Sequence, residues 1–328
     1  MIYIHLGYPK AGSTTLQKAL FLHHSDVVNL GLYPQSNVGK DSVDTVSDSI
    51  PYLNDLELRD FYWKMLHLDG MSYCEATMQD DWKRILNKYN EVGKSIVLSN
   101  EGFLSSRFSN PEIFEKIRRL KSVIPDARIF IVIRNQLDLL KSLYRDHPFD
   151  PRTLKYQPSP VSFERFIKAD LEMGCHNNIN TLFYSRLYKL LVSMFRKENV
   201  CILPLEMLRD YPSEFAYRLS GFMNIDSCKT IELLNERHEN LGPTEAQNLY
   251  RFIKSTLTPV LRLIPGIKRW GADIDASVSR VMRNIGATQK VSVSNEVHQL
   301  IRRIYADENK WLANELEISL SEYGYPIN

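Results

Sequence analysis

Residues 2–17, IYIHLGYPKAGSTTLQ, combine the patterns of a strand, a loop and a helix. Its first five residues, 2–6, are β-branched, aromatic or aliphatic apart from one histidine, which is typical of a β-strand. A glycine-containing loop over residues 7–12 follows at once, and the periodic apolar residues after it predict a helix over Ser13–His24. A strand that passes through a short glycine loop into a helix is the beginning of an α/β unit.

This loop has the composition of an anion-binding site. Small residues let the backbone wrap closely around an anion, and the amides at the start of the next helix point at it. Lys10 adds a positive charge, and hydroxyl donors are supplied in the first helical turn by Ser13, Thr14 and Thr15. The alternative is a surface turn before a Ser-capped helix, since Ser and Thr are ordinary N-caps. A strand, a P-K-x-G-[ST]-[ST] loop and an amphipathic helix are rarely found in this order by chance, which favours phosphate binding.

The loop differs from that of the common nucleotide triphosphatases. Their pattern, G-x-x-x-x-G-K-[ST], would place a lysine at position 13, where this chain has Ser13. Lys10 lies instead near the tip of the loop. This difference disfavours a P-loop kinase or triphosphatase that uses ATP and Mg²⁺, which stays open as one alternative. A non-catalytic nucleotide- or glycan-binding module is the other.

The rest of the chain alternates apolar strands with helical patterns. Strands are predicted at Ile2–Leu6, Ser95–Leu98, Arg128–Ile133 and Val200–Leu203. The middle two are nearly continuous apolar runs, which is typical of parallel strands covered on both faces. Helices are predicted over Ser13–His24, Gln79–Glu91, Pro111–Val123, Leu137–Asp146, Phe163–Met173, Ile179–Lys197, Ser213–Met223, Pro243–Leu257 and Asn295–Leu316. The pattern predicts a three-layer α/β/α fold with a central parallel sheet, related to P-loop nucleotide kinases.

We expect residues 1–328 to form a single domain. Two polar, proline-containing segments, Gly31–Asp55 and His147–Pro160, are predicted to be irregular insertions or lids over the core. The C-terminal part, residues 243–328, is expected to be helical. The basic run KIRRLK, residues 116–121, is predicted to be a solvated helix face.

Composition excludes several classes of protein. Hydrophobic residues make up 44% and charged residues 24% of the 328 residues, as in soluble globular proteins, and the net charge of +2 gives no indication of a nucleic-acid partner. No stretch approaches the ~20 apolar residues of a membrane span, and the N-terminus resembles no secretory signal. The cysteines, Cys74, Cys175, Cys201 and Cys228, form no C-x-x-C pair. We therefore expect reduced thiols, no zinc site and a cytoplasmic protein.

A second candidate anion site follows the predicted strand Arg128–Ile133. Arg134 comes directly after this strand, and Ser142 lies eight residues later on the next predicted helix. A guanidinium clamps a phosphate through two N–H donors, and a hydroxyl adds one more. Open α/β sheets bind ligands at the carboxyl ends of their strands, so Arg134 is expected at the same edge as Lys10. Two anion sites at one edge predict a ligand with two separated phosphate-like groups.

The segments YPKAGSTTLQ, residues 8–17, and RNQLDLLKSLY, residues 134–144, together resemble the motifs of sulfotransferases that use 3′-phosphoadenosine 5′-phosphosulfate (PAPS). Weaker similarities to this family cover residues 2–257, and Gln136 departs from the proline that often follows Arg-Asn. The resemblance implies a single sulfotransferase domain over residues 1–328. It also implies that the loop binds the 5′-phosphosulfate and that the Arg–Ser pair binds the 3′-phosphate. The implied donor-binding residues are Lys10, Ala11, Gly12, Ser13, Thr14, Thr15, Arg134 and Ser142.

The implied reaction is an in-line displacement at sulfur that releases adenosine 3′,5′-bisphosphate (PAP). By analogy with phosphoryl transfer, positioning and neutralisation of charge on the leaving oxygen supply most of the rate. Lys10 is the candidate to stabilise or protonate that oxygen. No metal is expected, because a sulfuryl group carries less charge than a γ-phosphate. The expected acceptor is a hydroxyl or amine of a carbohydrate or glycan-bearing molecule.

The acceptor also needs a general base. Glu101, in SNEGF at residues 99–103, follows the predicted strand Ser95–Leu98 and is the first candidate. The alternative for Glu101 is a helix-capping or solvated residue. His23 and His24 are further candidates, while Glu206 reaches the same sheet edge but resembles a structural residue of the family. The sequence fixes neither the position that is sulfated nor the oligomeric state.

Overall fold

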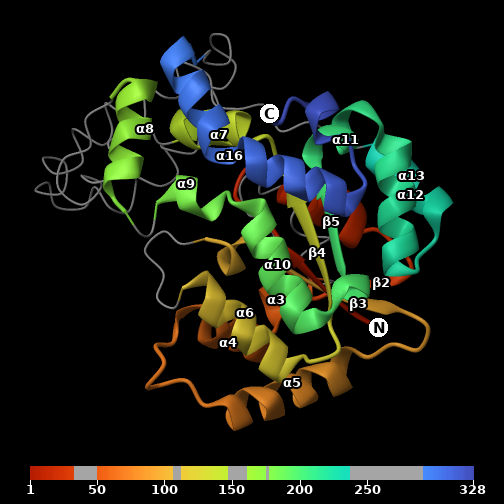
Figure 1. The fold of residues 1–328 in the computed structure, drawn as a ribbon. Coiled ribbons are helices and arrows are strands. Elements are labelled where there is room, and N and C mark those ends of the chain that lie inside the picture. The colour runs from red at the N-terminus through yellow and green to blue at the C-terminus, as the bar shows by residue number, and fades with distance from the viewer. Residues whose placement is uncertain (33–49, 106–111, 147–160, 175–176, 237–290) are drawn as a thin grey trace, which may run out of the picture. The chain divides into compact units, whose positions relative to one another are not determined.

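The computed structural model describes residues 1–32, 50–105, 112–146, 161–174, 177–236 and 291–328. It contains a five-stranded parallel sheet with the strand order β2-β3-β1-β4-β5 (Figure 1). The strands are β1 (Ile2–Leu6), β2 (Val27–Asn29), β3 (Ser95–Asn100), β4 (Arg128–Ile133) and β5 (Val200–Pro204). The four predicted strands are confirmed, two of them with the predicted bounds.

The short strand β2 is the one that the sequence did not predict. Three residues are too few to show a periodic pattern. Val27 pairs with Ser95 and Asn29 with Val97, so this segment becomes a strand by adding to the edge of β3. Pairing with a distant segment, and not local propensity, decides its conformation.

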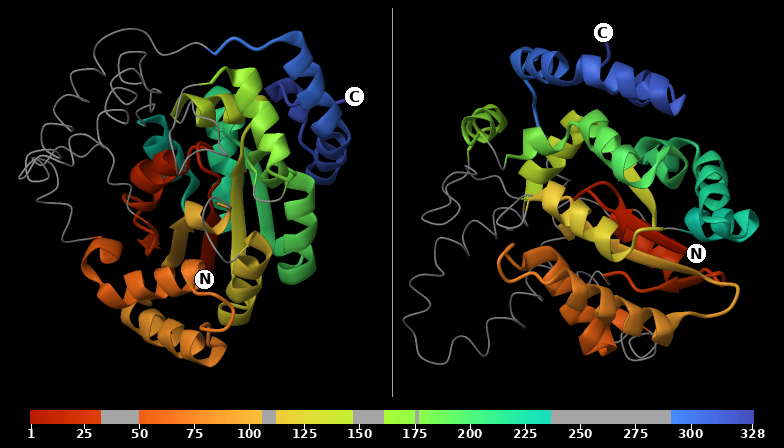
Figure 2. Two further views of the ribbon diagram at one scale, coloured as in Figure 1. Left: turned by 90° about the vertical axis from the view of Figure 1, so that its left-hand side faces the viewer. Right: turned by 60° about the horizontal axis from the view of Figure 1, so that its bottom comes forward.

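Helices cover both faces of the sheet. The chain passes from β1 to β2 in one direction across the sheet and from β3 to β4 and β4 to β5 in the other. Because parallel crossovers are right-handed, these connections lie on opposite faces. The π-helix η1 (Leu16–Phe21) therefore lies on one face, and α6 (Ile113–Val123) and α10 (Tyr184–Phe195), which contact each other, lie on the other (Figure 2). The three-layer α/β/α fold is confirmed.

The layer that holds η1 is completed by α12 (Pro212–Met223) and α13 (Ser227–Asn235), which pack against each other. The ring of Tyr3 on β1 meets Phe222 edge-on at 5.9 Å, and Phe130 on β4 meets Phe215 at 6.4 Å. These aromatic contacts, together with His5 against Phe21 at 5.7 Å, fix this layer to the middle of the sheet.

The remaining described elements are all helical. They are α1 (Ser13–Thr15), α3 (Pro51–Asn54), α4 (Leu56–His67), α5 (Glu75–Tyr89), η3 (Glu101–Phe103), α7 (Gln136–Asp146), α8 (Phe163–Glu172), α9 (Asn178–Thr181), η4 (Lys197–Asn199), α11 (Leu205–Asp210), α16 (Asn295–Leu316) and η5 (Leu320–Tyr323). The predicted helix over Ile179–Lys197 is two helices, and the Tyr8 hydroxyl donates to the Thr181 carbonyl at the end of the first, at 2.8 Å. Within the predicted irregular segment Gly31–Asp55, residues Pro51–Asn54 form the short helix α3. Proline is compatible with this first position, because the N–H that it lacks would have no partner within the helix.

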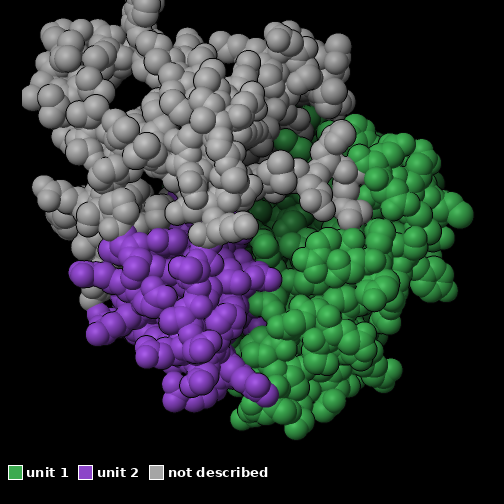
Figure 3. All heavy atoms as spheres, turned by 90° about the horizontal axis from the view of Figure 1, so that it is seen from above, with its two compact units in different colours: residues 1–135, 181–239, 305–328 green, residues 136–180, 240–304 purple. Residues whose placement is uncertain are grey.

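The chain divides into two compact units (Figure 3). Unit 1 comprises residues 1–135, 181–239 and 305–328 and holds all five strands, and unit 2 comprises residues 136–180 and 240–304. In unit 2 the Tyr144 hydroxyl on α7 donates to the Val161 carbonyl at 2.7 Å. The predicted segments 147–160 and 243–257 lie outside the described residues. The single sulfotransferase domain over residues 1–328 stays a prediction.

The basic run over residues 116–121 is not the solvated face that the sequence predicts. Lys116 and Arg119 are fully buried. The Arg119 guanidinium bonds to the Glu115 carboxylate at 3.0 Å and lies 4.0 Å from the centre of the Tyr73 ring. The prediction fails there because α6 packs against α4, α5 and η3, and the sequence of one helix does not show what covers it.

Asp55 begins α4 and ties it to the end of α5. Its carboxylate accepts hydrogen bonds from the Glu57 and Leu58 amides at 2.9 and 3.3 Å. It also accepts from the Lys88 ammonium and the Tyr89 hydroxyl, each at 2.7 Å. Burial raises the pKa of Asp55, but the hydrogen bonds from Lys88, Tyr89 and Leu58 together lower it below its usual value.

We predict that Asp55→Ala lowers the free energy of unfolding by about 1–2 kcal/mol, measured by urea denaturation, because the helix cap is lost. A carboxyl whose pKa is lowered in the folded state stabilises the protein above about pH 4, and this contribution disappears as the pH falls through the folded pKa. The difference between wild type and variant should therefore shrink below about pH 4.

Asp80→Ala is the matched control, because Asp80 forms only an exposed pair with Lys83 on the same helix. Its effect on stability should lie within about 0.5 kcal/mol of zero. An Asp55→Ala difference that stays constant between pH 6 and pH 3 contradicts the role of the Asp55 charge.

Candidate active site

The loop between β1 and α1 has a tight and unusual backbone. Lys10 has a φ of 69° and Gly12 a φ of 82°, both in the left-handed region. The Ala11 amide donates to the Tyr8 carbonyl at 3.1 Å and closes the turn. A lysine in the left-handed region is uncommon, and such residues concentrate at binding and catalytic sites.

Two glycines allow close approaches on either side of this loop. A Cβ on Gly7 would lie 2.3 Å from Ser13 Oγ and 3.1 Å from Glu101 Cγ. A Cβ on Gly12 would lie 2.5 Å from Leu205 Cδ1. The space that Gly7 leaves is therefore the place where the side chains of Ser13 and Glu101 meet.

Glu101 stands at the carboxyl end of β3, where the 3₁₀ turn η3 begins. Burial raises the pKa of its half-buried carboxyl above the usual value, while a hydrogen bond from the Ser13 hydroxyl and the charge of Lys10 act in the opposite direction. Glu101 is thus close to the loop lysine in a partly desolvated position. A carboxyl with a raised pKa beside a cation is the arrangement of many general bases.

Hydrogen bonds of the Asn100 and Lys116 side chains hold the turn that carries Glu101. The Asn100 side chain accepts a hydrogen bond from the Gly102 amide at 2.8 Å. The buried Lys116 ammonium donates to the carbonyls of Gly102 and Ser105 at 2.8 and 2.9 Å. Burial, with a smaller effect of the nearby Arg119 charge, lowers the pKa of Lys116 to about 8.

Arg134 lies against the same loop. Its guanidinium donates from Nη1 to the Lys10 carbonyl at 2.8 Å. The Tyr184 hydroxyl donates to the Arg134 carbonyl at 2.6 Å, so the backbone at the end of β4 is also fixed. The first loop and the arginine of the second motif, which the sequence predicts at one sheet edge, are in direct contact within unit 1.

Glu206 supports this end of β4. Its carboxylate accepts from the Asn135 amide at 2.9 Å and from the Tyr325 hydroxyl at 3.0 Å. Burial raises the pKa of Glu206, against the lowering effect of these hydrogen bonds. Its buried contacts agree with the structural role that the resemblance implies.

The other predicted site residues are described by their burial and their position in the fold. Thr14 and Thr15 are half-buried in α1, and Ala11 is buried. Ser142 lies on α7 in unit 2, so the Arg134–Ser142 pair stays a prediction. His23 is exposed, and His24 is buried with its Nε2 atom 3.2 Å from the Thr230 hydroxyl. Both histidines directly precede β2 and so lie at the amino edge of the parallel sheet, opposite the edge that holds Glu101.

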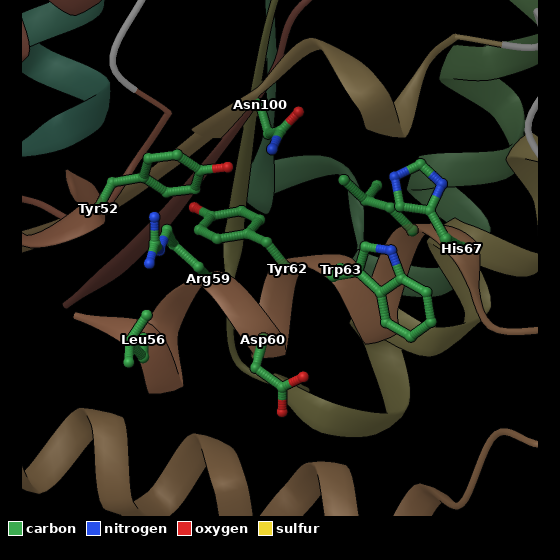
Figure 4. Close-up of a pocket in the computed structure, with 9 residues that line it drawn as sticks. Tyr52, Leu56, Arg59, Asp60, Tyr62, Trp63, His67 and Asn100 are labelled. Atoms are coloured by element: carbon green, nitrogen blue, oxygen red, sulfur yellow. The ribbon is translucent and has the colours of Figure 1, made fainter. Parts of the chain in front are cut away.

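A pocket of about 400 Å³ opens beside the turn of Glu101 (Figure 4). Figure 4 shows the rings of Tyr52 and Tyr62 side by side below Asn100, with Trp63 and His67 farther along α4. The lining residues are Tyr52, Leu56, Arg59, Asp60, Tyr62, Trp63, Leu66, His67 and Asn100. Most of these residues lie on α4, a helix that was not predicted from the sequence. Apolar residues at 58, 61, 62, 65 and 66 have the helical spacing that could have revealed α4.

A family model for the sulfotransferase domain matches residues 3–257. The chain belongs to this sulfotransferase family. The match covers the Lys10 loop, Glu101, Arg134 and Ser142. The predicted enzyme class, a PAPS-dependent sulfotransferase, is confirmed by it.

Solved sulfotransferase structures are similar to this one. The crystal structure of a sulfotransferase from Alicyclobacillus acidocaldarius matches with a TM-score of 0.51 and 12% identity, over 98% of this chain and 97% of that chain. The sulfotransferase domain of the curacin biosynthetic pathway matches with a TM-score of 0.43 and 12% identity, over 97% and 98% of the two chains. A mouse sulfotransferase complexed with PAP matches with a TM-score of 0.38 and 12% identity, over 71% and 62%. The first likeness shows a common fold. No curated protein matches the chain.

No described helix combines the length and apolarity needed to cross a membrane. No group of three or more His, Cys, Asp or Glu side chains within the described ranges could hold a metal ion. The three cysteines in the described part of the chain, Cys74, Cys201 and Cys228, are free thiols.

We predict that Gly12→Ala destabilises the sulfotransferase by about 1–3 kcal/mol, measured by urea denaturation. A left-handed alanine is strained, and its Cβ meets Leu205. Adding Leu205→Ala should not restore stability, because the backbone strain persists. Gly221→Ala, in open space on α12, is the control and should be neutral or stabilising by up to about 1 kcal/mol. Equal effects at both glycines contradict the strained loop.

Proposed function

We propose that the enzyme transfers the sulfuryl group of PAPS to a hydroxyl or amine of a carbohydrate or glycan-bearing acceptor and releases PAP. The observation that carries this proposal is the hydrogen bond between Arg134 and the Lys10 carbonyl, at 2.8 Å. It places the Arg134 guanidinium of the second anion-binding motif against the backbone of the first, at Lys10. A donor with two separated anionic groups needs such a pair of sites.

The hydrogen-bond donors of the loop are suited to binding the 5′-phosphosulfate. The proposed binding residues are Lys10, Ala11, Gly12, Ser13, Thr14 and Thr15, and the left-handed backbone of Gly12 lets the loop turn into the helix whose first amides face the anion. The amides at the start of a helix have no acceptor within that helix and can donate to an anion. We propose that Arg134 and Ser142 bind the 3′-phosphate, with the guanidinium as a forked donor.

We propose that Lys10 and Glu101 carry the chemistry. As the bond from sulfur to the leaving nucleotide breaks, negative charge develops on the bridging oxygen, and the Lys10 ammonium stabilises or protonates it. The Glu101 carboxylate accepts the proton from the acceptor as the new oxygen–sulfur or nitrogen–sulfur bond forms. Its raised pKa makes it a better base than an exposed glutamate. No metal takes part in these steps.

The pocket beside Glu101 supports a carbohydrate acceptor. Its Tyr52 and Trp63 rings offer flat apolar surfaces, while Arg59 and Asn100 offer hydrogen-bonding groups. Sugar rings have apolar faces and a rim of hydroxyls, so walls of this mixed kind can hold them. Asn100, which lines the pocket, directly precedes Glu101 in the chain, and we propose that an acceptor in this pocket presents its nucleophile to the Glu101 carboxylate.

We also propose that the enzyme acts in the cytoplasm. The free thiols of Cys74, Cys201 and Cys228 within the described residues support this location, because a reducing compartment keeps thiols unpaired.

We predict that PAP binds the wild-type enzyme and that Lys10→Met weakens this binding at least tenfold in calorimetry, because the loop loses its cation. ATP with Mg²⁺ is the competing ligand in the same measurement. Tighter binding of ATP–Mg²⁺ than of PAP contradicts the proposed function and favours a kinase or triphosphatase. Lys18→Met, on the same N-terminal segment but outside the loop, is the matched control and should bind PAP like the wild type.

We predict that Glu101→Gln lowers kcat by about 10²–10⁴-fold with radiolabelled PAPS and a panel of oligosaccharides, while PAP affinity stays within twofold. The wild-type rate should fall in acid as the pH drops through the raised pKa of Glu101, because only the carboxylate accepts a proton. Glu112→Gln, which changes a glutamate that precedes α6, is the control. Full activity of Glu101→Gln removes Glu101 as the base and favours a different residue in that role.

A further inference from the structure

We infer that Gln17, Ser99 and His5 form a positioning network that holds Glu101 against Ser13 at the end of β3. The inference rests on the proposed function, since it assigns these residues to the placement of its general base. The Gln17 amide donates from Nε2 to Ser99 Oγ at 2.8 Å, and His5 Nδ1 lies 2.8 Å from the same oxygen. All three side chains are buried, at 3%, 0% and 1% exposed.

The contact between Gln17 and Ser99 resembles the contact between Ser13 and Glu101 in the proposed active site. Ser99 lies on β3, and Glu101 follows two residues later, after the extended backbone of Asn100 and at the first position of η3. Because alternate residues of an extended chain point the same way, the side chains of Ser99 and Glu101 leave the same face. Ser13 and Gln17 are four positions apart at the start of the first helix, so they also share a face. Ser99 meets Gln17 in the same way that Glu101 meets Ser13.

The register of the sheet supplies the third member of each set. His5 on β1 pairs directly with Ser99 on β3, and the next pair is Leu6 with Asn100. Continued by one residue, this register places Gly7 opposite Glu101. The missing side chain of Gly7 leaves the space in which Ser13 and Glu101 converge. His5 fills the equivalent space at Ser99 and bonds to it.

Packing alone does not explain three polar side chains in this place. Burial of polar groups is costly, and apolar residues of similar size would fill the same volume at lower cost. His5 Nε2 is buried and has no hydrogen-bond partner among the described residues. Burial lowers the pKa of His5 to about 3, so the ring is neutral and the network does not carry charge to the site.

Gln17 also lies in an unusual element. η1 is a π-helix over Leu16–Phe21, and π-helical turns are rare and are found frequently at functional sites. The directional bond from Gln17 to Ser99 sets how the first helix lies on β3. Because α1, which holds Ser13, runs directly into η1, the bond also sets where Ser13 lies relative to Glu101.

Gln17→Met tests the inference, because methionine has nearly the same length but no donor. With radiolabelled PAPS and the best oligosaccharide acceptor, kcat should fall about ten- to hundredfold, while PAP affinity stays within twofold. The acid limb of the pH–rate profile should move toward the value of an exposed glutamate, as water reaches Glu101. Ser99→Ala removes a single oxygen, folds more readily and should produce the same changes. The double variant should lose no more than either single one.

Thr230→Val is the matched control. It removes the buried contact between the Thr230 hydroxyl and His24 Nε2, which are 3.2 Å apart. His24 lies just beyond the C-terminal end of η1, the helix that contains Gln17. It should lower the melting temperature by a similar amount without changing kcat or the pH profile. If Gln17→Met and Ser99→Ala also lower only the melting temperature, the network is structural and the inference is overturned.

A failure of the proposed function gives different results from a failure of the network. If wild-type protein neither binds PAP nor transfers sulfate, the proposed function is contradicted. The titration of the Glu101 carboxyl, followed by carbon NMR and assigned with Glu101→Gln, then still tests the network. An unchanged Glu101 pKa in Gln17→Met overturns the inference in that case as well.

Discussion

The hydrogen bond from the Arg134 guanidinium to the Lys10 carbonyl is the interaction on which the proposed active site depends. It joins the ends of β4 and β1, which are adjacent strands. It also meets the loop at the residue whose backbone is left-handed. A guanidinium has five N–H donors, so one bond to a carbonyl leaves donors for an anion. Arg134 can therefore hold the loop in shape and bind the donor nucleotide at the same time.

Buried polar groups support the carboxyl edge of the sheet. Glu206 holds the backbone after Arg134, and Lys116 holds the turn after Glu101. Such groups stabilise a single arrangement, because any other arrangement leaves a buried charge without a partner. The raised pKa of Glu101 has the same origin: the burial that supports the turn also removes water from its carboxyl. Stability of the edge and basicity of the proposed catalytic residue therefore depend on the same desolvation.

The sequence predicted the elements whose pattern is local and strong. β1 and β4 have the predicted bounds because each is a compact run of strand-forming residues. β2 was missed because it exists through pairing with β3, and α4 because its spacing was not recognised. The solvated face predicted at Lys116 and Arg119 was wrong, since charge composition does not reveal which helices pack around a side chain. The pocket lined by α4 was missed for the same reason, because the sequence does not show which elements lie next to one another.

By itself the sequence determined the chemistry of the loop, the parallel α/β fold and the family, because these follow from residue types at short spacing. The tertiary structure decided which of those residues meet. Arg134 contacts Lys10, Glu101 meets Ser13, and Gln17 reaches Ser99 only because the strand order brings β1, β3 and β4 side by side. The physical reason is that chain neighbours fix local conformation, whereas contacts across a sheet depend on the register of strands far apart in the chain.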